Sequence, residues 1–287
     1  MLNIHSSLGP LDAPIKLLYI NPNSTLSFTL ETVTYLSESD PVPSLSPYQS
    51  LASEPIPNTE TRSLRYPGVR IDFYTAPSTA PPSIDGTLHG VISTAEIIRD
   101  LKLETFDGVQ ELREKYDAIV VSCFSEHPLI PVLKEQFALY QGAGVMEKKV
   151  VVLGILEAGI IAALRLGPTF GIATTGRNWE PLFDQAIKTL SIDSQRYTGT
   201  RGTGFNAVSL HGDGPEEKLF EAGVELVEKG AKVIVLGCAG MAPMRQKIQD
   251  RLKSQTGQDI PVVDGVLAAL DQAIQLAQSR TISQLNA

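Results

Sequence analysis

Two cysteines are the residues best placed to do chemistry in this 287-residue chain. Cys123 ends a predicted strand over 116–123, and Cys238 follows a predicted strand over 233–236. Both strands are almost wholly apolar, which is typical of strands covered on both faces, and both lead into small or polar residues. Ligands bind at this end of the strands in open parallel α/β sheets. Two thiols in such positions can act as a pair of acid and base groups on one substrate.

The local sequence favours a lowered pKa for the first thiol. Cys123 lies between its strand and a helix predicted over 128–140, and the amides of a helix N-terminus lower the pKa of a thiol. Because an ordinary thiol has a pKa of about 8.5, a modest shift makes it a base near neutral pH. The small residues around Cys238 allow backbone and ligand to approach closely. A buried core cysteine is the competing interpretation at each position.

Polar residues end two further predicted strands, over 15–20 and 169–174. Asn21, Asn23, Ser24 and Thr25 follow the first strand, and Thr174 and Thr175 end the second. Their side chains and backbone amides can hold a planar, electron-rich ligand such as a carboxylate or an imide. Helix capping is the competing interpretation for the same residues.

Apolar strands and helices alternate along the chain, which predicts mostly parallel sheets with helices on both faces. Each half contains one strand that ends in Asn or Thr and one that ends in Cys. This rhythm favours two similar Rossmann-like lobes with the active site in the cleft between them. We expect a first lobe over 1–130, completed by a C-terminal helix over 264–287, and a second lobe over 131–263.

Other segments contribute less to the prediction. Residues 37–67 are rich in Pro and Ser and are expected to form a surface insertion. The glycine-rich segment 198–204 is expected to be a flexible loop, followed by a weak strand over 206–210. His127 lies four residues after Cys123 and could tune its thiol, but a partly exposed loop histidine is the favoured interpretation.

Composition and charge exclude several classes of protein. The net charge of −8 and the absence of a Lys/Arg cluster argue against a nucleic-acid or anionic-membrane partner. No stretch has the length and composition of a transmembrane helix or a signal peptide, so a cytoplasmic protein with free thiols is expected. Two cysteines and four scattered histidines give no metal-ligand spacing, so no metal site is predicted.

In five blocks the chain resembles the Asp/Glu/hydantoin racemase superfamily, most closely its hydantoin/allantoin racemase branch. The blocks are Ile-Asn-Pro-Asn-Ser-Thr at 20–25, Ser-Cys-Phe at 122–124, Gly-Ile-Leu-Glu-Ala at 154–158, Gly-Ile-Ala-Thr-Thr at 171–175 and Leu-Gly-Cys-Ala-Gly-Met at 236–241. They span most of the chain outside 37–67. The first and last blocks are specific in combination.

The resemblance implies a racemase that needs no cofactor and acts on a small molecule, a 5-substituted hydantoin or allantoin. One of Cys123 and Cys238 removes the proton from the stereocentre as a thiolate, and the other returns a proton to the opposite face. The family also suggests a homo-oligomer. The predicted substrate-binding residues are Asn21, Asn23, Ser24, Phe124, Ser125, Thr174, Thr175, Ala239 and Gly240.

Three alternatives stay open at this point. A racemase of acidic amino acids needs more cationic or amide groups for the second carboxylate. A related isomerase or decarboxylase uses one cysteine as nucleophile or proton donor, and a non-enzymatic small-molecule sensor can have the same fold. The chain also departs from bacterial members, with Ser-Glu-His-Pro at 125–128 in place of a Gly-Asp-Pro-type stretch, and in 37–67 and 198–214, which resemble what fungal relatives carry.

Overall fold

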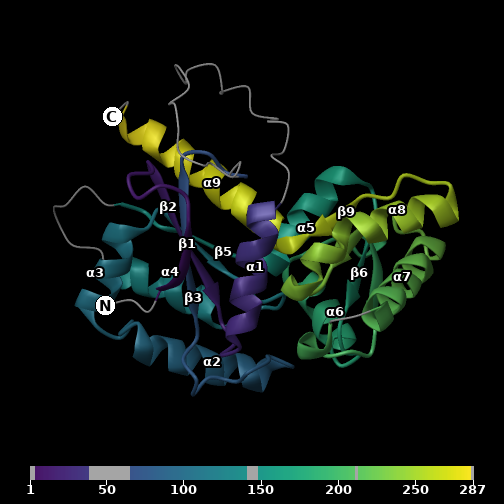
Figure 1. Ribbon diagram of the computed structural model, residues 1–287, viewed down its shortest axis with the longest axis horizontal. Helices are drawn as coiled ribbons and strands as arrows, with labels where there is room; N and C mark the ends of the chain where they lie inside the picture. Colours follow the sequence, from purple (N-terminus) through teal and green to yellow (C-terminus); the bar gives the residue numbers. More distant parts are fainter. Residues whose placement is uncertain (1–3, 39–64, 141–147, 211–212, 286–287) are drawn as a thin grey trace.

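Two sheets lie side by side in the computed structural model, which describes residues 4–38, 65–140, 148–210 and 213–285 (Figure 1). The strands of the first sheet, in spatial order, are β1 (Ile4–Leu8), β3 (Val69–Thr75), β2 (Ile15–Asn21), β4 (Ala118–Val121) and β5 (Val151–Gly154). Those of the second sheet are β7 (Tyr197–Gly202), β6 (Phe170–Thr174), β8 (Val233–Leu236) and β9 (Val262–Asp264). All pairs are parallel except that of β1 with β3.

Both sheets repeat one strand order. Apart from β1, the first sheet runs β3-β2-β4-β5 and the second runs β7-β6-β8-β9, so each has the order second, first, third, fourth. In this topology the chain leaves the first and third strands in opposite directions, which opens a crevice at their carboxyl ends. The predicted fold of two similar α/β lobes with mostly parallel sheets is therefore confirmed.

Helices cover the sheets and connect their strands. They are α1 (Leu26–Glu38), α2 (Thr87–Asp100), α3 (Phe106–Lys115), α4 (Leu129–Leu139), α5 (Ile155–Leu166), α6 (Trp179–Thr189), α7 (Asp213–Glu228), α8 (Arg245–Thr256) and α9 (Gly265–Leu285). Short 3₁₀ turns lie at η2 (Ser194–Arg196), η3 (Ala207–Ser209) and η4 (Ala239–Met244). In the described part of the chain, no helix is long and apolar enough to cross a membrane.

Two local predictions are wrong. The glycine-rich segment forms strand β7, which pairs with β6 at the edge of the second sheet, and the strand predicted over 206–210 is the 3₁₀ turn η3. Two glycines interrupt β7, so its sequence did not indicate a strand. Pairing with β6 supplies its backbone hydrogen bonds. The antiparallel strand β1 was not expected; its side chains alternate between partly buried and exposed. Most of the 37–67 insertion lies outside the described residues.

Helices α5 and α9 join the two lobes. They pack against each other, α5 also lies on β8 and β9, and α9 lies on β4 and β5, so one continuous hydrophobic core includes residues of both sheets. The C-terminal helix thus packs on the first sheet. Strand β5 pairs with β4, however, so the first sheet continues past residue 130 and the sheets divide between Gly154 and Phe170.

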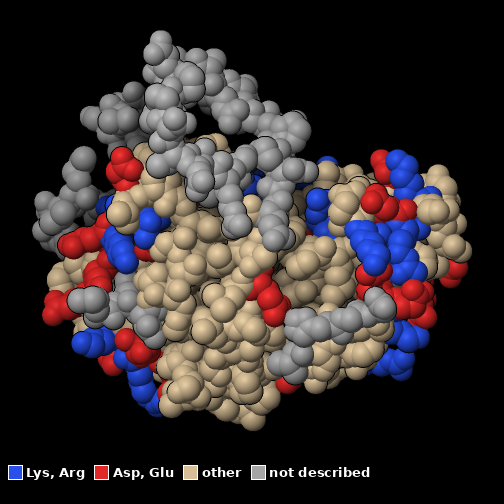
Figure 2. All heavy atoms as spheres, viewed as in Figure 1, with Lys and Arg blue, Asp and Glu red and all other residues tan. Residues whose placement is uncertain are grey.

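Charged side chains gather over the two ends of the face shown in Figure 2, whereas the middle, over α1 and α2, is largely uncharged. Exposed apolar side chains on these helices include Leu26, Leu30, Leu88 and Val91. Apolar surface of this kind is common at protein interfaces. The expected homo-oligomer stays a prediction.

The joint between the lobes depends on the absence of a side chain at Gly265. A Cβ atom there would lie 2.7 Å from the carbonyl oxygen of Ile155, at the start of α5. At Gly159, inside α5, a Cβ atom would meet its nearest neighbours at 3.4 Å, an ordinary contact.

We expect Gly265→Ala to lower the free energy of unfolding by about 1–3 kcal/mol, because backbone must shift to admit the methyl group. Gly159→Ala is the matched control and should raise it by up to about 1 kcal/mol through helix propensity. Urea denaturation measures both values. Equal effects of the two variants would contradict the tight joint.

Candidate active site

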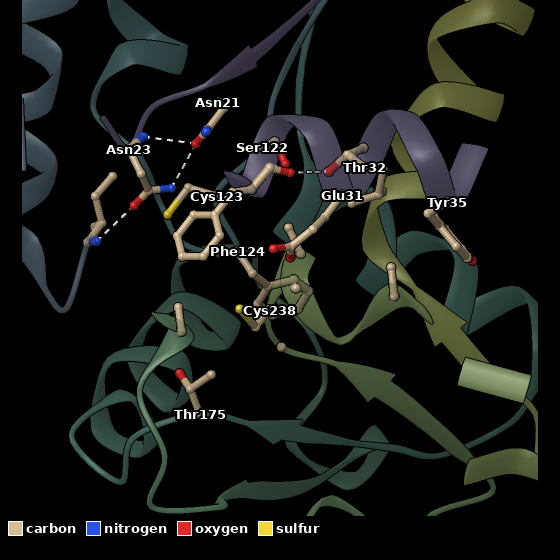
Figure 3. A pocket seen from close by; sticks show the side chains of 18 of the residues that line it. Asn21, Asn23, Glu31, Thr32, Tyr35, Ser122, Cys123, Phe124, Thr175 and Cys238 are labelled. Atoms are coloured by element: carbon tan, nitrogen blue, oxygen red, sulfur yellow. Dashed lines mark hydrogen bonds between the residues drawn. The ribbon is translucent and has the colours of Figure 1, made fainter. Parts of the chain in front are cut away.

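Cys123 and Cys238 occupy equivalent places in the two sheets. Each lies two residues beyond its strand, β4 or β8, and each of these is the third strand of its lobe when β1, which has no counterpart in the second sheet, is left out of the count. Both line one pocket with about 810 Å³ of empty space, open solvent at its mouth included. Figure 3 shows the two cysteines entering the pocket from different lobes. The positions predicted from the sequence therefore meet at one site.

The residue before Cys238, Gly237, lies where no side chain fits. A Cβ atom at Gly237 would lie 2.7 Å from Cβ of Thr174 and 3.0 Å from Cγ2 of Ile172. The Thr174 hydroxyl, which is fully buried, donates a hydrogen bond to the Gly237 carbonyl at 2.9 Å. Thr174 thus holds the Cys238 segment in place and does not line the pocket, in contrast to its predicted role in substrate binding.

Asn21 and Asn23 have different roles at the pocket. The Asn21 side-chain amide donates to the Thr25 carbonyl and the Thr29 hydroxyl, and its oxygen accepts from the backbone and side-chain N–H groups of Asn23. Because both of its N–H donors are used within the protein, Asn21 orients Asn23. The Asn23 oxygen accepts from the Ile84 amide at 2.9 Å, which leaves one side-chain N–H of Asn23 for a ligand.

The remaining predicted residues fall into two groups. Residues that line the pocket, besides both cysteines and both asparagines, are Phe124, Thr175, Ala239 and Gly240. Two do not line it. Ser24 is tied through its backbone N–H to the Pro81 carbonyl, and the Ser125 hydroxyl donates to the Cys123 sulfur at 3.2 Å. Ser125 therefore contacts the predicted catalytic thiol rather than the pocket space.

Sequence reasoning missed one wall of the pocket, on α1. Phe28, Glu31, Thr32 and Tyr35 all line it, at the spacing of one helix face. The helical periodicity of these residues can be read from the sequence, but the part of the protein that faces them cannot. Other lining residues that were not predicted are Tyr19, Ile84, Ser122, Trp179, Ala207, Gly237, Ala242, Pro243 and Val266.

Aromatic rings brace the pocket from the second lobe. Trp179 lines the pocket and stacks on Phe183, with ring centroids 5.3 Å apart. Phe183 in turn meets the edge of Phe124, which follows Cys123, at a centroid distance of 5.3 Å. The side chain of Asn178, next to Trp179, donates to the backbone carbonyl of Asp85, next to Ile84, at 2.8 Å. These contacts fix the two lobes relative to each other around the cysteines.

Comparison with known proteins identifies the family to which the chain belongs. The family model Asp/Glu/Hydantoin racemase matches residues 17–273. The chain belongs to the Asp/Glu/hydantoin racemase family. A hydantoin racemase from Rhizobium meliloti is 28% identical over 200 residues, covering 69% of this chain and 72% of the relative. An uncharacterized Schizosaccharomyces pombe protein, C1F7.10, is also 28% identical and covers 92% of both chains.

Solved structures agree with this assignment. The crystal structure of allantoin racemase from Pseudomonas fluorescens superimposes with a TM-score of 0.65 and 25% identity, over 92% of this chain and 91% of that one. A maleate cis-trans isomerase from Nocardia farcinica shares the fold, with a TM-score of 0.55 and 15% identity, over 93% and 92% of the two chains. The chain is thus related to hydantoin and allantoin racemases, and it shares its fold with a maleate cis-trans isomerase.

Burial dominates the ionisation of both thiols in this racemase-family site. It raises the pKa of Cys123 to about 12 and that of Cys238 to about 11. The Ser125 hydroxyl opposes the shift at Cys123, and the Gly240 and Met241 amides oppose it at Cys238. Cys238 and Asp85 both raise the pKa of Cys123 further by charge repulsion, because they lie close to its sulfur.

The expected lowering of the Cys123 pKa by a helix N-terminus is therefore wrong. Helix α4 begins at Leu129, six residues after Cys123, so its amides do not meet the sulfur. His127 does not have the predicted exposed position either, because its side chain is buried at 1% exposure. Burial lowers the pKa of this imidazole to about 4, which keeps it neutral at pH 7.

Among the described residues, no group of three or more His, Cys, Asp or Glu side chains is arranged to hold a metal ion. Of the side chains that line the pocket, those able to donate hydrogen bonds to a ligand include Asn23 and Thr175. In Figure 3, Asn23 lies beside Cys123 and Thr175 lies in the opposite lobe, on the side of Cys238. The site can therefore combine two acid/base groups with donors for a developing negative oxygen.

We expect Ser125→Ala to reduce the reactivity of Cys123, because it removes a hydrogen bond that stabilises the thiolate. In a Cys238→Ser background, the rate of Cys123 alkylation by iodoacetamide should rise with pH toward 12 and fall about 10-fold on the Ser125→Ala change. Cys238, measured in a Cys123→Ser background, is the internal control and should react equally with or without Ser125. Equal slowing of both thiols would show that the substitution disturbs the pocket generally.

Proposed function

We propose that the protein is a cofactor-independent racemase of 5-substituted hydantoins or allantoin that uses Cys123 and Cys238 as its two acid/base groups. The observation that carries the proposal is that one pocket is lined by two cysteines, each from the third strand of its own lobe. Relationship to hydantoin and allantoin racemases supports the substrate class. A two-base reaction needs groups on opposite sides of one carbon, and two lobes that face each other provide such an arrangement.

In the proposed reaction, the thiolate of one cysteine takes the proton from carbon 5 of the hydantoin ring. The electron pair left on carbon spreads into the adjacent ring carbonyl, so the intermediate is planar and its oxygen carries negative charge. The thiol of the other cysteine then delivers its proton to the opposite face and becomes the thiolate. Proton and charge balance over the step, and the two cysteines have exchanged roles.

The remaining pocket residues have supporting roles in this proposal. Hydrogen bonds to the oxygen that gains charge stabilise the intermediate more than the substrate. The free side-chain N–H of Asn23 and the Thr175 hydroxyl are the proposed donors, with Asn21 positioning Asn23. The amides of Gly240 and Met241 support the thiolate of Cys238.

The high thiol pKa values fit a carbon acid as substrate. A weakly acidic C–H group needs a strong base. When burial raises the pKa of a thiol, its thiolate is a stronger base than that of an ordinary thiol. The cost is that little thiolate is present at neutral pH. A racemase of acidic amino acids is less well supported, because no Lys or Arg is among the described residues that line the pocket.

We expect Cys123→Ser and Cys238→Ser each to reduce racemisation of a pure hydantoin enantiomer by about 1,000-fold or more, since a serine hydroxyl is a far weaker acid than a thiol. Loss of optical rotation for allantoin and for benzyl- and isopropylhydantoin measures the rate, with an enzyme-free blank. One variant can still exchange the proton of a single enantiomer, because its remaining cysteine serves one face. Full turnover by either variant would contradict the two-cysteine scheme, and ligand binding without turnover by the wild type would favour the sensor.

A further inference from the structure

Glu31 is the one charged side chain among the described residues that line the pocket. It lies on the face of α1 that also carries Phe28, Thr32 and Tyr35. Figure 3 shows its side chain directed from α1 into the space beside Cys238. The two-base reaction makes no use of this group, because both proton transfers are assigned to the cysteines. Its presence in the pocket therefore calls for another role.

Building on the proposed racemase function, we propose that Glu31 selects hydantoins whose carbon-5 substituent ends in N–H donors, such as a carboxamide, a urea or a guanidinium group. A carboxylate accepts hydrogen bonds and donates none. Its two oxygens offer about four acceptor positions, so Glu31 can bind a substrate N–H while it keeps its contacts within the protein.

The surroundings of Glu31 make the selection directional. An anionic substituent would meet the Glu31 carboxylate, which carries charge of the same sign. An N–H donor meets a charge-assisted acceptor at the same place. The same group thus attracts one class of substrate and rejects its acidic counterpart.

The rest of the pocket leaves room for the arm that carries such a donor. Phe28, Trp179 and Val266 contribute apolar surface to the lining. A short carbon chain can lie against such surface while the hydantoin ring stays between the cysteines. Glu31 is therefore proposed as a residue that determines specificity through the substituent, not as a catalytic residue.

The sharpest test compares two substrates that differ only in the end group. These are 5-(carbamoylmethyl)hydantoin and 5-(carboxymethyl)hydantoin, which have nearly the same shape but end in a neutral amide and an anion. For the wild type, we expect kcat/KM for the amide to exceed that for the acid by about 100-fold. Glu31→Gln should reduce this ratio at least about 10-fold, since a neutral amide both donates and accepts.

Glu228→Gln is the matched control, because it removes the same charge from an exposed position on α7 outside the pocket lining. It should leave the ratio unchanged. Calorimetric binding of both compounds to the Cys123→Ser/Cys238→Ser protein, with and without Glu31→Gln, should show the same preference independently of catalysis. This second measurement also covers the case in which Glu31→Gln turns over too slowly to assay.

The outcomes separate this inference from the proposed function. A wild-type ratio near 1, or a ratio that Glu31→Gln leaves unchanged in both turnover and binding, would overturn the role of Glu31 even if 5-methylhydantoin is racemised. A clear binding preference without racemisation of any hydantoin would support Glu31 as the selecting group and contradict the proposed reaction. Equal changes in Glu31→Gln and Glu228→Gln would assign the effect to net charge and overturn the inference.

Discussion

The contact between the backbone at Gly265 and the first turn of α5 determines how the two lobes meet. Helix α9 lies on the first sheet and α5 on the second, and the two helices pack against each other with Gly265 beside the Ile155 carbonyl. Because each sheet opens its crevice between its first and third strands, the angle at this joint decides whether the two crevices face one another. Phe124 packs against the same joint, through Gly159 and Gly265, one residue after Cys123. The position of one cysteine is thus coupled directly to the contact between lobes.

Burial of the two thiols has opposite consequences for their chemistry. The burial of Cys123 and the partial burial of Cys238 raise both pKa values and make thiolate scarce at neutral pH. The same removal from water strengthens every hydrogen bond and charge interaction that the pocket offers to an intermediate. The Ser125 hydroxyl and the Gly240 and Met241 amides offset part of the penalty at the sulfur atoms. In the proposed reaction, burial leaves less thiolate at neutral pH but makes the thiolate that forms a stronger base.

The sequence allowed much of this arrangement to be predicted. Apolar runs followed by Cys123 and Cys238 located two equivalent strand ends, and Asn21 and Thr175 marked the neighbouring ones. The predictions failed where a property depends on partners distant in the chain. Thr174 has a pocket-like sequence context, yet its hydroxyl is used by the Gly237 carbonyl of the adjacent strand. In the sequence, Glu31 and Tyr35 look like ordinary surface positions of an amphipathic helix. In the structure they line the pocket, and their helix packs against η4 of the second lobe. Strand β7 is interrupted by two glycines, which weaken a strand, and it forms because β6 offers it an edge.

The central claim is that two different groups handle the proton on opposite faces of one carbon. The direct measurement follows deuterium during the first few per cent of conversion of a single hydantoin enantiomer in D₂O, with chiral separation and mass spectrometry. Two separate bases predict deuterium in the product enantiomer and almost none in the recovered substrate, because the group that removes a proton from one face does not return one to it. Equal labelling of substrate and product from the earliest times, above the enzyme-free blank, would show a single base acting on both faces and would contradict the account.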